Sequence, residues 1–174
     1  LSYHINKSGF NAKKVSKKKI KFDIKNFKFF IEPHIEQGPV LEKKKIPLGI
    51  VTGIRGSFRF RDAFCKGEYL HSGATPYDYR KDSVVAVSNL VNEMNIFWKA
   101  QLKKNKDLVI TFGQFFTDNE EHSFAKSSGL VNFCIDVRSN SKNTLEYTKK
   151  NLIKKIKLIE KQTKTKFFLG KETN

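Results

Sequence analysis

Residues 57–61 read Ser-Phe-Arg-Phe-Arg, in which apolar phenylalanines alternate with a serine and two arginines. A strand with one face in a core and the other in water shows this period of two. Strand character extends over residues 46–66, with a first apolar piece at residues 49–54. The glycines at 49, 53 and 56 indicate a bend or hinge within this region.

Two amphipathic helices are predicted beyond this strand. The first covers residues 77–101, with Asp78 as its expected N-cap. Its apolar side chains recur at three- and four-residue steps: Val84, Val87, Val91, Met94 and Trp98. The second begins at Asn143 or Thr144 and carries lysines opposite an apolar face of Leu145, Leu152, Ile156 and Ile159.

Three further strands complete the pattern. Residues 108–117 and 130–137 are expected to be antiparallel neighbours, and residues 166–169 form a last short strand. The order strand, helix, strand, strand, helix, strand predicts an α+β fold of the split βαβ, ferredoxin-like type. Such a fold has a four-stranded antiparallel sheet with two helices on one face.

The region before residue 49 is expected to belong to something else. Residues 1–26 are polar and rich in lysine, which predicts a loop or a poorly ordered connection. Residues 27–32 predict a buried strand that ends at Pro33, because proline cannot donate a ladder hydrogen bond. A turn and a short helical stretch are expected at residues 37–42. We therefore predict two parts, residues 1–48 and residues 49–174.

The chain of 174 residues carries 34 Lys and Arg against 17 Asp and Glu, a net charge of +17. Such a balance attracts nucleic acid or anionic surfaces. Most of the charge is lysine spread along the chain, however, and no arginine-fork or nucleic-acid module is recognisable. Solvated lysine faces and a general compositional bias are the favoured explanation, so nucleic acid is not the expected partner.

Cysteines and apolar runs indicate the expected compartment. Cys65 and Cys134 match no zinc or redox spacing and are expected to be reduced thiols of a cytoplasmic protein. The sequence has no apolar run long enough to span a membrane. The N-terminus does not begin with Met and lacks the pattern of a signal peptide, so the chain is expected to be a fragment.

His34 opens the first chemistry-bearing motif, His-Ile-Glu-Gln-Gly-Pro at residues 34–39. A histidine at a strand end can present its imidazole to zinc, but it can equally be a hydrogen-bonded structural residue. Gln37 can hold a polar substrate group through its amide. Glu36 either orients a neighbour or is a solvated acid.

His71 and Arg138 are the other candidate site residues. His71 precedes a small-residue loop, Ser-Gly-Ala-Thr-Pro, from which it can stabilise a developing oxyanion or simply lie at the surface. Arg138 ends a strand, and its fork suits a substrate carboxylate or an ion pair with Asp136. Arg80 and Asp82 are expected to act structurally at the start of the first helix.

These motifs together resemble a known family. In order, they are His-Ile-Glu-Gln-Gly-Pro-Val-Leu-Glu from His34, Ile-Pro-Leu-Gly-Ile-Val-Thr-Gly-Ile from Ile46, His-Ser-Gly-Ala-Thr-Pro from His71, and Phe-Cys-Ile-Asp-Val-Arg ending at Arg138. The set is similar to the N-carbamoyl-L-amino-acid hydrolases and allantoate amidohydrolases, within the zinc-dependent aminoacylase and carboxypeptidase superfamily. The resemblance runs from about residue 27 to the C-terminus.

The resemblance implies a role for each candidate. His34 corresponds to a ligand of a site for two divalent ions, zinc or manganese, and Gln37 to a contact of the ureido group. His71 corresponds to a lid-domain histidine that stabilises the tetrahedral intermediate in the partner subunit. Arg138 corresponds to the arginine that binds the substrate carboxylate. The family's lid domain has the split βαβ layout and forms the homodimer contact.

Departures from the family pattern are equally clear. The family's early His-x-Asp, its bridging Asp, its paired Glu and its late His have no counterpart here, although a two-metal hydrolase needs such groups. A lid asparagine is replaced by Ala125, and a leucine before His34 by Pro33. We therefore expect a fragment comprising a lid domain and a short piece of an α/β catalytic domain. Alone, it is expected to be inactive and to bind no metal tightly.

The full-length function implied is metal-dependent cleavage of the linear ureido C–N bond of N-carbamoyl-L-amino acids or allantoate. The alternative is a non-enzymatic dimerisation module or a Lys-rich nucleic-acid-binding domain.

Overall fold

The structure, a computed structural model, describes residues 1–17 and 24–174. It divides into two compact units, Leu1–Ile50 and Val51–Asn174. The boundary predicted from the sequence, after residue 48, lies two residues before this one.

Leu1–Ile50 contains only short helices among its described residues: α1 (Ser2–Lys7), α2 (Ala12–Lys17), the 3-10 turn η1 (Ile24–Asn26) and α3 (Val40–Lys44). The prediction of a loop for residues 1–26 is wrong at α1 and α2, and residues 18–23 lie outside the described part. Helix α1 buries no residue, which explains why its sequence shows no apolar periodicity.

The buried strand predicted for residues 27–32 is also wrong. These residues form no strand, and Phe29 and Phe30 are 83% and 88% exposed. Among the described residues of Leu1–Ile50 no other strand is present for it to pair with, and an unpaired strand cannot satisfy its backbone groups. The turn and short helix expected near residues 37–42 are confirmed by α3.

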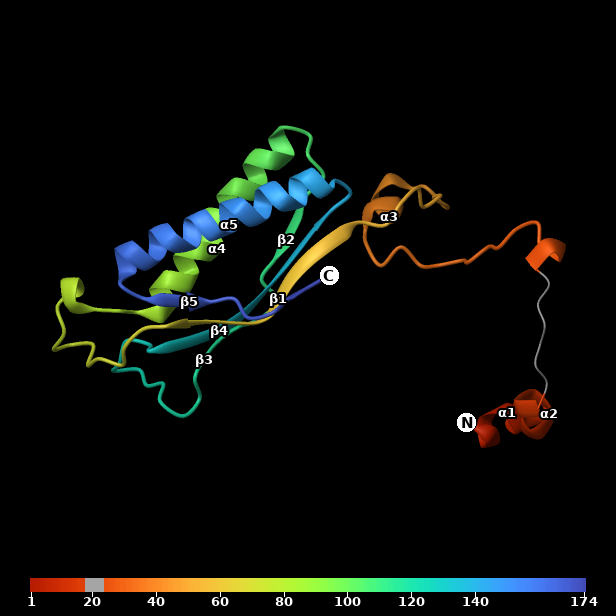
Figure 1. The fold of residues 1–174 in the computed structure, drawn as a ribbon, viewed down its shortest axis with the longest axis horizontal. Helices are drawn as coiled ribbons and strands as arrows, with labels where there is room; N and C mark the ends of the chain where they lie inside the picture. The colour runs from red at the N-terminus through yellow and green to blue at the C-terminus, as the bar shows by residue number, and fades with distance from the viewer. Residues whose placement is uncertain (18–23) are drawn as a thin grey trace. The chain divides into compact units, whose positions relative to one another are not determined.

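Val51–Asn174 is a two-layer unit in which helices α4 and α5 cover one face of an antiparallel sheet (Figure 1). The chain order of its elements is β1 (Gly56–Lys66), η2 (Tyr77–Tyr79), α4 (Ser83–Lys103), β2 (Val109–Thr111), β3 (Phe115–Thr117), β4 (Leu130–Ser139), α5 (Lys142–Thr163), β5 (Lys166–Phe168) and β6 (Glu172–Thr173). The main strand order is β2-β4-β1-β5, with β3 pairing with β4 and β6 with β1. The predicted α+β, split βαβ fold is confirmed.

A bulge in β1 decides which side chains enter the core. Its pairing with β4 shifts between Phe60 and Ala63, so that two residues of β1 stand opposite one of β4. Phe58 and Phe60 face the helices before the bulge, and Ala63 and Cys65 face them after it. A strict alternation from Phe58 would have turned Ala63 and Cys65 to solvent.

Helix α4 begins later than its apolar pattern suggested. The N-cap is Asp82, whose carboxylate accepts hydrogen bonds from the backbone N–H groups of Val84 and Val85 at 2.9 and 3.3 Å. The expected cap Asp78 lies in the separate turn η2. Because a carboxylate cap satisfies otherwise unpaired N–H groups, Asp82 fixes where the helix starts. The structural role predicted for Asp82 is therefore confirmed.

The other predicted boundaries need smaller corrections. Helix α5 is capped by Ser141 rather than by Asn143 or Thr144, since the Ser141 hydroxyl accepts from Thr144 N–H at 3.3 Å. Residues 45–55 form no strand, so strand β1 begins only at Gly56. The predicted strand at residues 108–117 is split into β2 and β3, and both pair antiparallel with β4 as expected.

The core lies between the sheet and the two helices. Its fully buried large side chains include Leu90 and Met94 of α4, Phe133 and Ile135 of β4, and Leu152 of α5. The opposite face of the sheet is more exposed, as the alternating burial along β4 shows, and on β4 it carries Leu130, Asn132, Cys134, Asp136 and Arg138. That open face holds one of the candidate sites.

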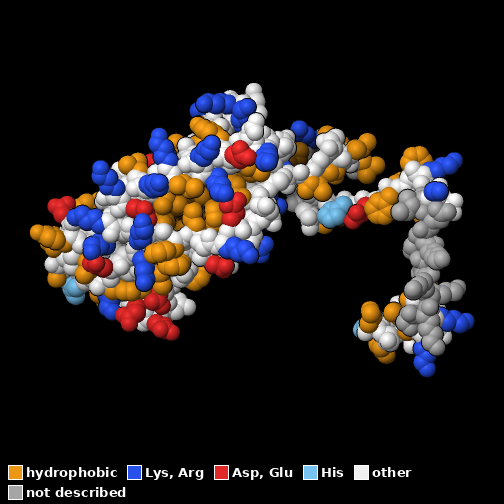
Figure 2. Space-filling model, in the orientation of Figure 1, with side chains coloured by type: hydrophobic (Ala, Val, Ile, Leu, Met, Phe, Trp, Pro, Cys, Tyr) orange, Lys and Arg blue, Asp and Glu red, His pale blue; other side chains and the backbone are white. Residues whose placement is uncertain are grey.

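Charge and exposure agree with a solvated lysine surface. On the visible face of Val51–Asn174, Lys and Arg side chains are dispersed, with acidic groups among them (Figure 2). Cys65 is buried and Cys134 half-buried, and both are free thiols, as expected. No helix among the described residues has the length and apolar character needed to cross a membrane.

Candidate functional site

Arg138 stands on the open face of the sheet near the end of β4. It lies opposite Ser57 of β1 on one side and Val109 of β2 on the other. Its side chain is 50% exposed, whereas its neighbours Val137 and Ser139 are buried toward the helices. The strand pairing therefore holds the Arg138 backbone rigidly and leaves its guanidinium accessible.

Asp136 orients the Arg138 guanidinium. Its Oδ2 accepts from Arg138 Nε and Nη2 at 2.8 and 2.7 Å, and its Oδ1 accepts from Arg59 Nε at 3.0 Å. Residues 136 and 138 share a face of the strand, which is why the predicted ion pair forms. This ion pair is compatible with the predicted binding of a substrate carboxylate. Asp136 Oδ2 occupies only the Nε–Nη2 edge of the Arg138 guanidinium and leaves the other donors available.

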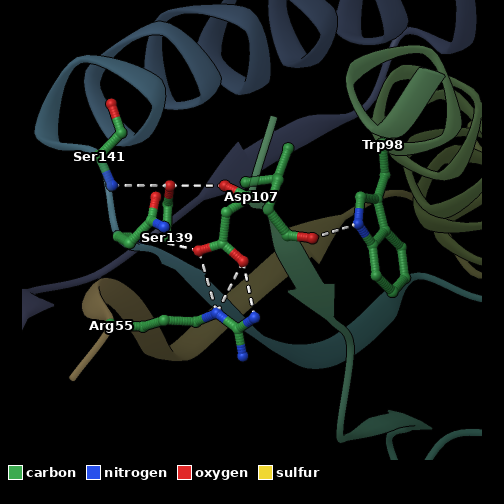
Figure 3. A network of polar contacts seen from close by, with 7 residues as sticks. Arg55, Trp98, Asp107, Ser139 and Ser141 are labelled. Atoms are coloured by element: carbon green, nitrogen blue, oxygen red, sulfur yellow. Dashed lines mark hydrogen bonds and ion pairs between the residues drawn. The ribbon is translucent and has the colours of Figure 1, made fainter. Parts of the chain in front are cut away.

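A second ion pair, between Arg55 and Asp107, is drawn in Figure 3. Both residues line the same cavity as Arg138. Arg55 Nε and Nη2 donate to Asp107 at 2.6 to 3.0 Å, and Asn140 N–H donates to the same carboxylate at 2.8 Å. Arg55 and this backbone N–H hold the pKa of Asp107 below its usual range, and Asp107 in turn raises the pKa of Arg55.

The same network joins three segments of the chain. The Ser139 hydroxyl donates to the Asp107 carbonyl at 2.6 Å and accepts from Ser141 N–H at 3.1 Å. The Trp98 indole N–H donates to the Leu108 carbonyl at 2.6 Å. The start of β2 is thereby fixed to α4 on one side and to the loop between β4 and α5 on the other.

His71 lies at the other end of the sheet. Beyond β1 the chain continues to pair with the segment before β4, through Ser127 N–H to Leu70 carbonyl at 2.9 Å and Ser72 N–H to Ala125 carbonyl at 2.8 Å. His71 faces Lys126 within this pairing. Between Arg138 and Leu130, β4 alone spans about 25 Å. The structure therefore does not bring His71 and Arg138 of one chain together.

The loop after His71 is held by Arg80. Its Nε donates to the Thr75 carbonyl at 2.9 Å, and its Nη2 donates to the Ser72 carbonyl. The structural role predicted for Arg80 is thus confirmed, with the loop rather than a carboxylate as its partner.

Two backbone N–H groups fix the orientation of the His71 ring. Gly73 and Ala74 donate to His71 Nδ1 at 3.2 and 3.1 Å. A ring nitrogen that accepts two hydrogen bonds carries no proton in the neutral imidazole, so the proton is on Nε2. The exposed ring therefore offers Nε2–H as a hydrogen-bond donor.

The first motif lies in Leu1–Ile50, and its side chains are exposed. His34 Nδ1 contacts the Ile35 carbonyl at 2.5 Å, and Gln37 adopts a left-handed backbone with φ 54°. The Glu36 carboxylate accepts from Val40 and Leu41 N–H at 3.1 and 2.9 Å. The exposed Glu36 carboxylate thereby satisfies the first two backbone N–H groups of helix α3.

The described residues do not form a metal centre. They contain no cluster of three or more His, Cys, Asp or Glu side chains able to hold a metal ion. Zinc sites use at least three protein ligands, so His34 alone does not fit one. No chemical step is therefore assigned to a metal in this chain.

Sequence reasoning missed Arg55, Asp107 and the Tyr69–Asp118 pair. The Tyr69 hydroxyl donates to Asp118 at 2.9 Å, and burial together with this bond raises the pKa of Tyr69 to about 12. The partners are separated by about fifty residues in each pair, so no local pattern could indicate them. Arg55 lies inside the region of predicted strand character, residues 46–66, and nothing in that pattern distinguishes it as a site residue.

Comparison with known proteins places this α+β unit in a class. No family model matches the chain. It is 47% identical over 68 residues to the N-carbamoyl-L-amino-acid amidohydrolase of Paenarthrobacter aurescens, covering 39% of this chain and 16% of that protein. It is 35% identical over 113 residues to the allantoate amidohydrolase of Escherichia coli, covering 65% and 26%.

A solved structure shows the same family likeness as these sequence relatives. A hydantoinase/carbamoylase family amidase from Burkholderia ambifaria superposes with a TM-score of 0.68 at 28% identity, covering 78% of this chain and 32% of that one. The chain is thus homologous to one segment of the amidohydrolases of the hydantoinase/carbamoylase family. It spans only about a quarter or less of the two curated relatives named above.

Proposed function

We propose that this chain supplies the lid of a metal-dependent amidohydrolase that cleaves the linear ureido C–N bond of N-carbamoyl-L-amino acids or allantoate. The relatives named above carry both activities in their names. Val51–Asn174 is the proposed lid, and the first motif belongs to the proposed catalytic part. The working form is a homodimer joined through the lids.

The separation of Arg138 and His71 carries this proposal. Both residues match family motifs, yet about 25 Å of sheet lies between them in one chain. A substrate the size of a carbamoyl amino acid cannot contact both. A two-fold homodimer resolves this, because each site then takes Arg138 from one copy and His71 from the other.

The chemistry of each group fits its proposed place. Arg138 offers the unused part of its fork to a carboxylate, for which a guanidinium is well suited. His71 offers Nε2–H at an orientation fixed by its loop, as stabilisation of an oxyanion requires. Gln37 would contact the ureido group of the substrate. His34 would be one ligand of the metal site, whose other ligands would come from other parts of the full-length enzyme.

The alternative function has no comparable support. The relatives and the solved structure named above are hydrolases, and none is named as a nucleic-acid-binding protein. The dispersed lysines of Figure 2 do not form a separate basic face in that view.

Complementation between two variants tests the proposal. Residues 51–174 replace the matching lid of the Paenarthrobacter aurescens enzyme, and the hybrid is prepared as His71→Ala and as Arg138→Gln. Each variant should lose at least about a hundredfold in turnover. An equimolar, re-equilibrated mixture should recover about a quarter of the hybrid's activity, because half of the dimers are mixed and each has one intact site.

His122→Ala is the matched control, since His122 is exposed and Thr117 is the one hydrogen-bond partner of its side chain among the described residues. It should leave turnover unchanged. A mixture no more active than its two components, with folding verified by circular dichroism and dimers by light scattering, would refute the shared site. Turnover by the unmodified 174-residue chain would contradict the expectation that it is inactive alone.

A further inference from the structure

Arg138 shares its groove with a second guanidinium. A polar cavity of about 700 Å³ on the open face of the sheet is lined by Thr52, Gly53, Ile54, Arg55, Asp107, Arg138 and Asn140. Arg55 is 53% exposed there, close to the 50% of Arg138. No family motif quoted above gives Arg55 a role.

Strand register explains why the two arginines meet. Ser57 and Val109 stand opposite Arg138, and Arg55 and Asp107 each lie two residues before them. Arg55 and Asp107 directly precede β1 and β2, and both line the same cavity as Arg138. Their ion pair crosses the end of β4 at Asn140, whose N–H bonds Asp107.

Both guanidinium groups have donors left over. Arg55 uses Nε and Nη2 on Asp107, and Arg138 uses Nε and Nη2 on Asp136. A guanidinium carries five N–H donors. Among residues 1–17 and 24–174, neither Nη1 group has a protein partner, so both are available to a ligand in the groove.

The charge of the groove selects the ligand. Arg55 and Arg138 contribute two positive charges, and Asp107 removes one. The adjoining Arg59 and Asp136 add one charge of each sign. The net charge of the five residues is therefore still one positive charge. A single carboxylate neutralises it, whereas a neutral ligand leaves a cation uncompensated and a dianion overcompensates.

We propose that Arg55 is a second substrate-binding arginine, which together with Arg138 holds the single carboxylate of a small α-ureido acid. This proposal rests on the proposed function and adds a residue to its carboxylate site. Asp107 is the positioning residue, because its two oxygens fix the Nε edge of Arg55 and leave Nη1 free. A carboxylate held by two forks is fixed in direction as well as in place.

Nuclear magnetic resonance of the arginine Nε–H groups of the full chain tests this. The probe is N-carbamoyl-L-alanine, and N-ethylurea is its analogue without the carboxylate. Only the first should shift the Arg55 and Arg138 resonances. Arg55→Gln and Arg138→Gln should each weaken binding by at least about tenfold, the cost of losing a charged hydrogen bond. Arg61→Gln, an exposed arginine of β1 outside the groove, should bind as the wild type does.

Asp107→Asn separates binding from positioning. Asp107→Asn keeps one oxygen that can accept from the Nε edge of Arg55 and removes the competing negative charge. If Arg55 contacts the ligand, the affinity should therefore stay within about twofold of the wild type or rise. If Arg55 acts only by anchoring the segment through Asp107, Asp107→Asn and Arg55→Gln will weaken binding alike, which overturns the proposal.

The remaining outcomes separate this inference from the proposed function. Unchanged affinity in Arg55→Gln with loss in Arg138→Gln would refute the role of Arg55 and leave the role of Arg138 intact. Unchanged affinity in both variants would refute the carboxylate site itself. The carboxylate site would also be refuted if N-ethylurea shifted the Arg55 and Arg138 resonances as much as N-carbamoyl-L-alanine does, or if neither probe shifted them.

Discussion

Replacing Asp107 by alanine should lower the stability of Val51–Asn174 by about 2 kcal/mol. The half-exposed ion pair with Arg55 contributes at most about 1 kcal/mol, because solvent screens it. The bond from Asn140 N–H to a charged acceptor contributes about another 1 kcal/mol. Urea denaturation followed by Trp98 fluorescence measures the difference, since Trp98 bonds the segment next to Asp107.

The effect should depend on pH with a definite sign. The pKa of Asp107 lies below its ordinary value of 3.8 in the folded chain. Its stabilisation is therefore complete above the unfolded value and is lost as the pH falls through the lower, folded value. The difference in unfolding free energy between wild type and Asp107→Ala should be constant above about pH 5. It should shrink as the pH falls below about 4.

A matched variant shows what would refute this reasoning. Glu121→Ala removes a carboxylate that pairs with Lys126 at 3.5 Å, with both side chains well exposed. It should cost less than about 0.5 kcal/mol. Equal effects of Asp107→Ala and Glu121→Ala, or a gap that persists at pH 2, would show that the network does not stabilise the fold.

Three further predictions concern the same unit. Asp82→Ala should cost about 1 kcal/mol by removing the N-cap of α4, with Asp82→Asn recovering most of it in the same denaturation assay. Gly67→Ala should cost more than about 2 kcal/mol, because its Cβ would lie 2.0 Å from the Lys81 carbonyl oxygen; a melting temperature equal to wild type would contradict the packing. Burial raises the pKa of the Cys65 thiol to about 11, so maleimide at pH 7.5 should label half-buried Cys134 much faster, and mass spectrometry of peptides would reveal the opposite order.

The fold was largely predictable because its signals are local. The alternation at residues 57–61 and the helical spacing from Val84 to Trp98 each reflect a single buried face, and their order along the chain limits the topology to few arrangements. Helix boundaries were less predictable. Asp78 and Asp82 are equally good caps as residue types, and only the backbone geometry decides between them.

The candidate site was predictable only in part. Sequence alone determined which residues are candidates for chemistry, since His71, Arg138 and His34 stand in ordered motifs whose residue types and spacing are visible in the chain. Tertiary structure decided what each can do. Strand pairing put Arg55 and Asp107 beside Arg138 although they are 52 residues apart in sequence, and the same sheet set His71 at the far end from Arg138. The physical reason is that a sheet brings together residues by register, which depends on a bulge and on long-range hydrogen bonds rather than on any local pattern.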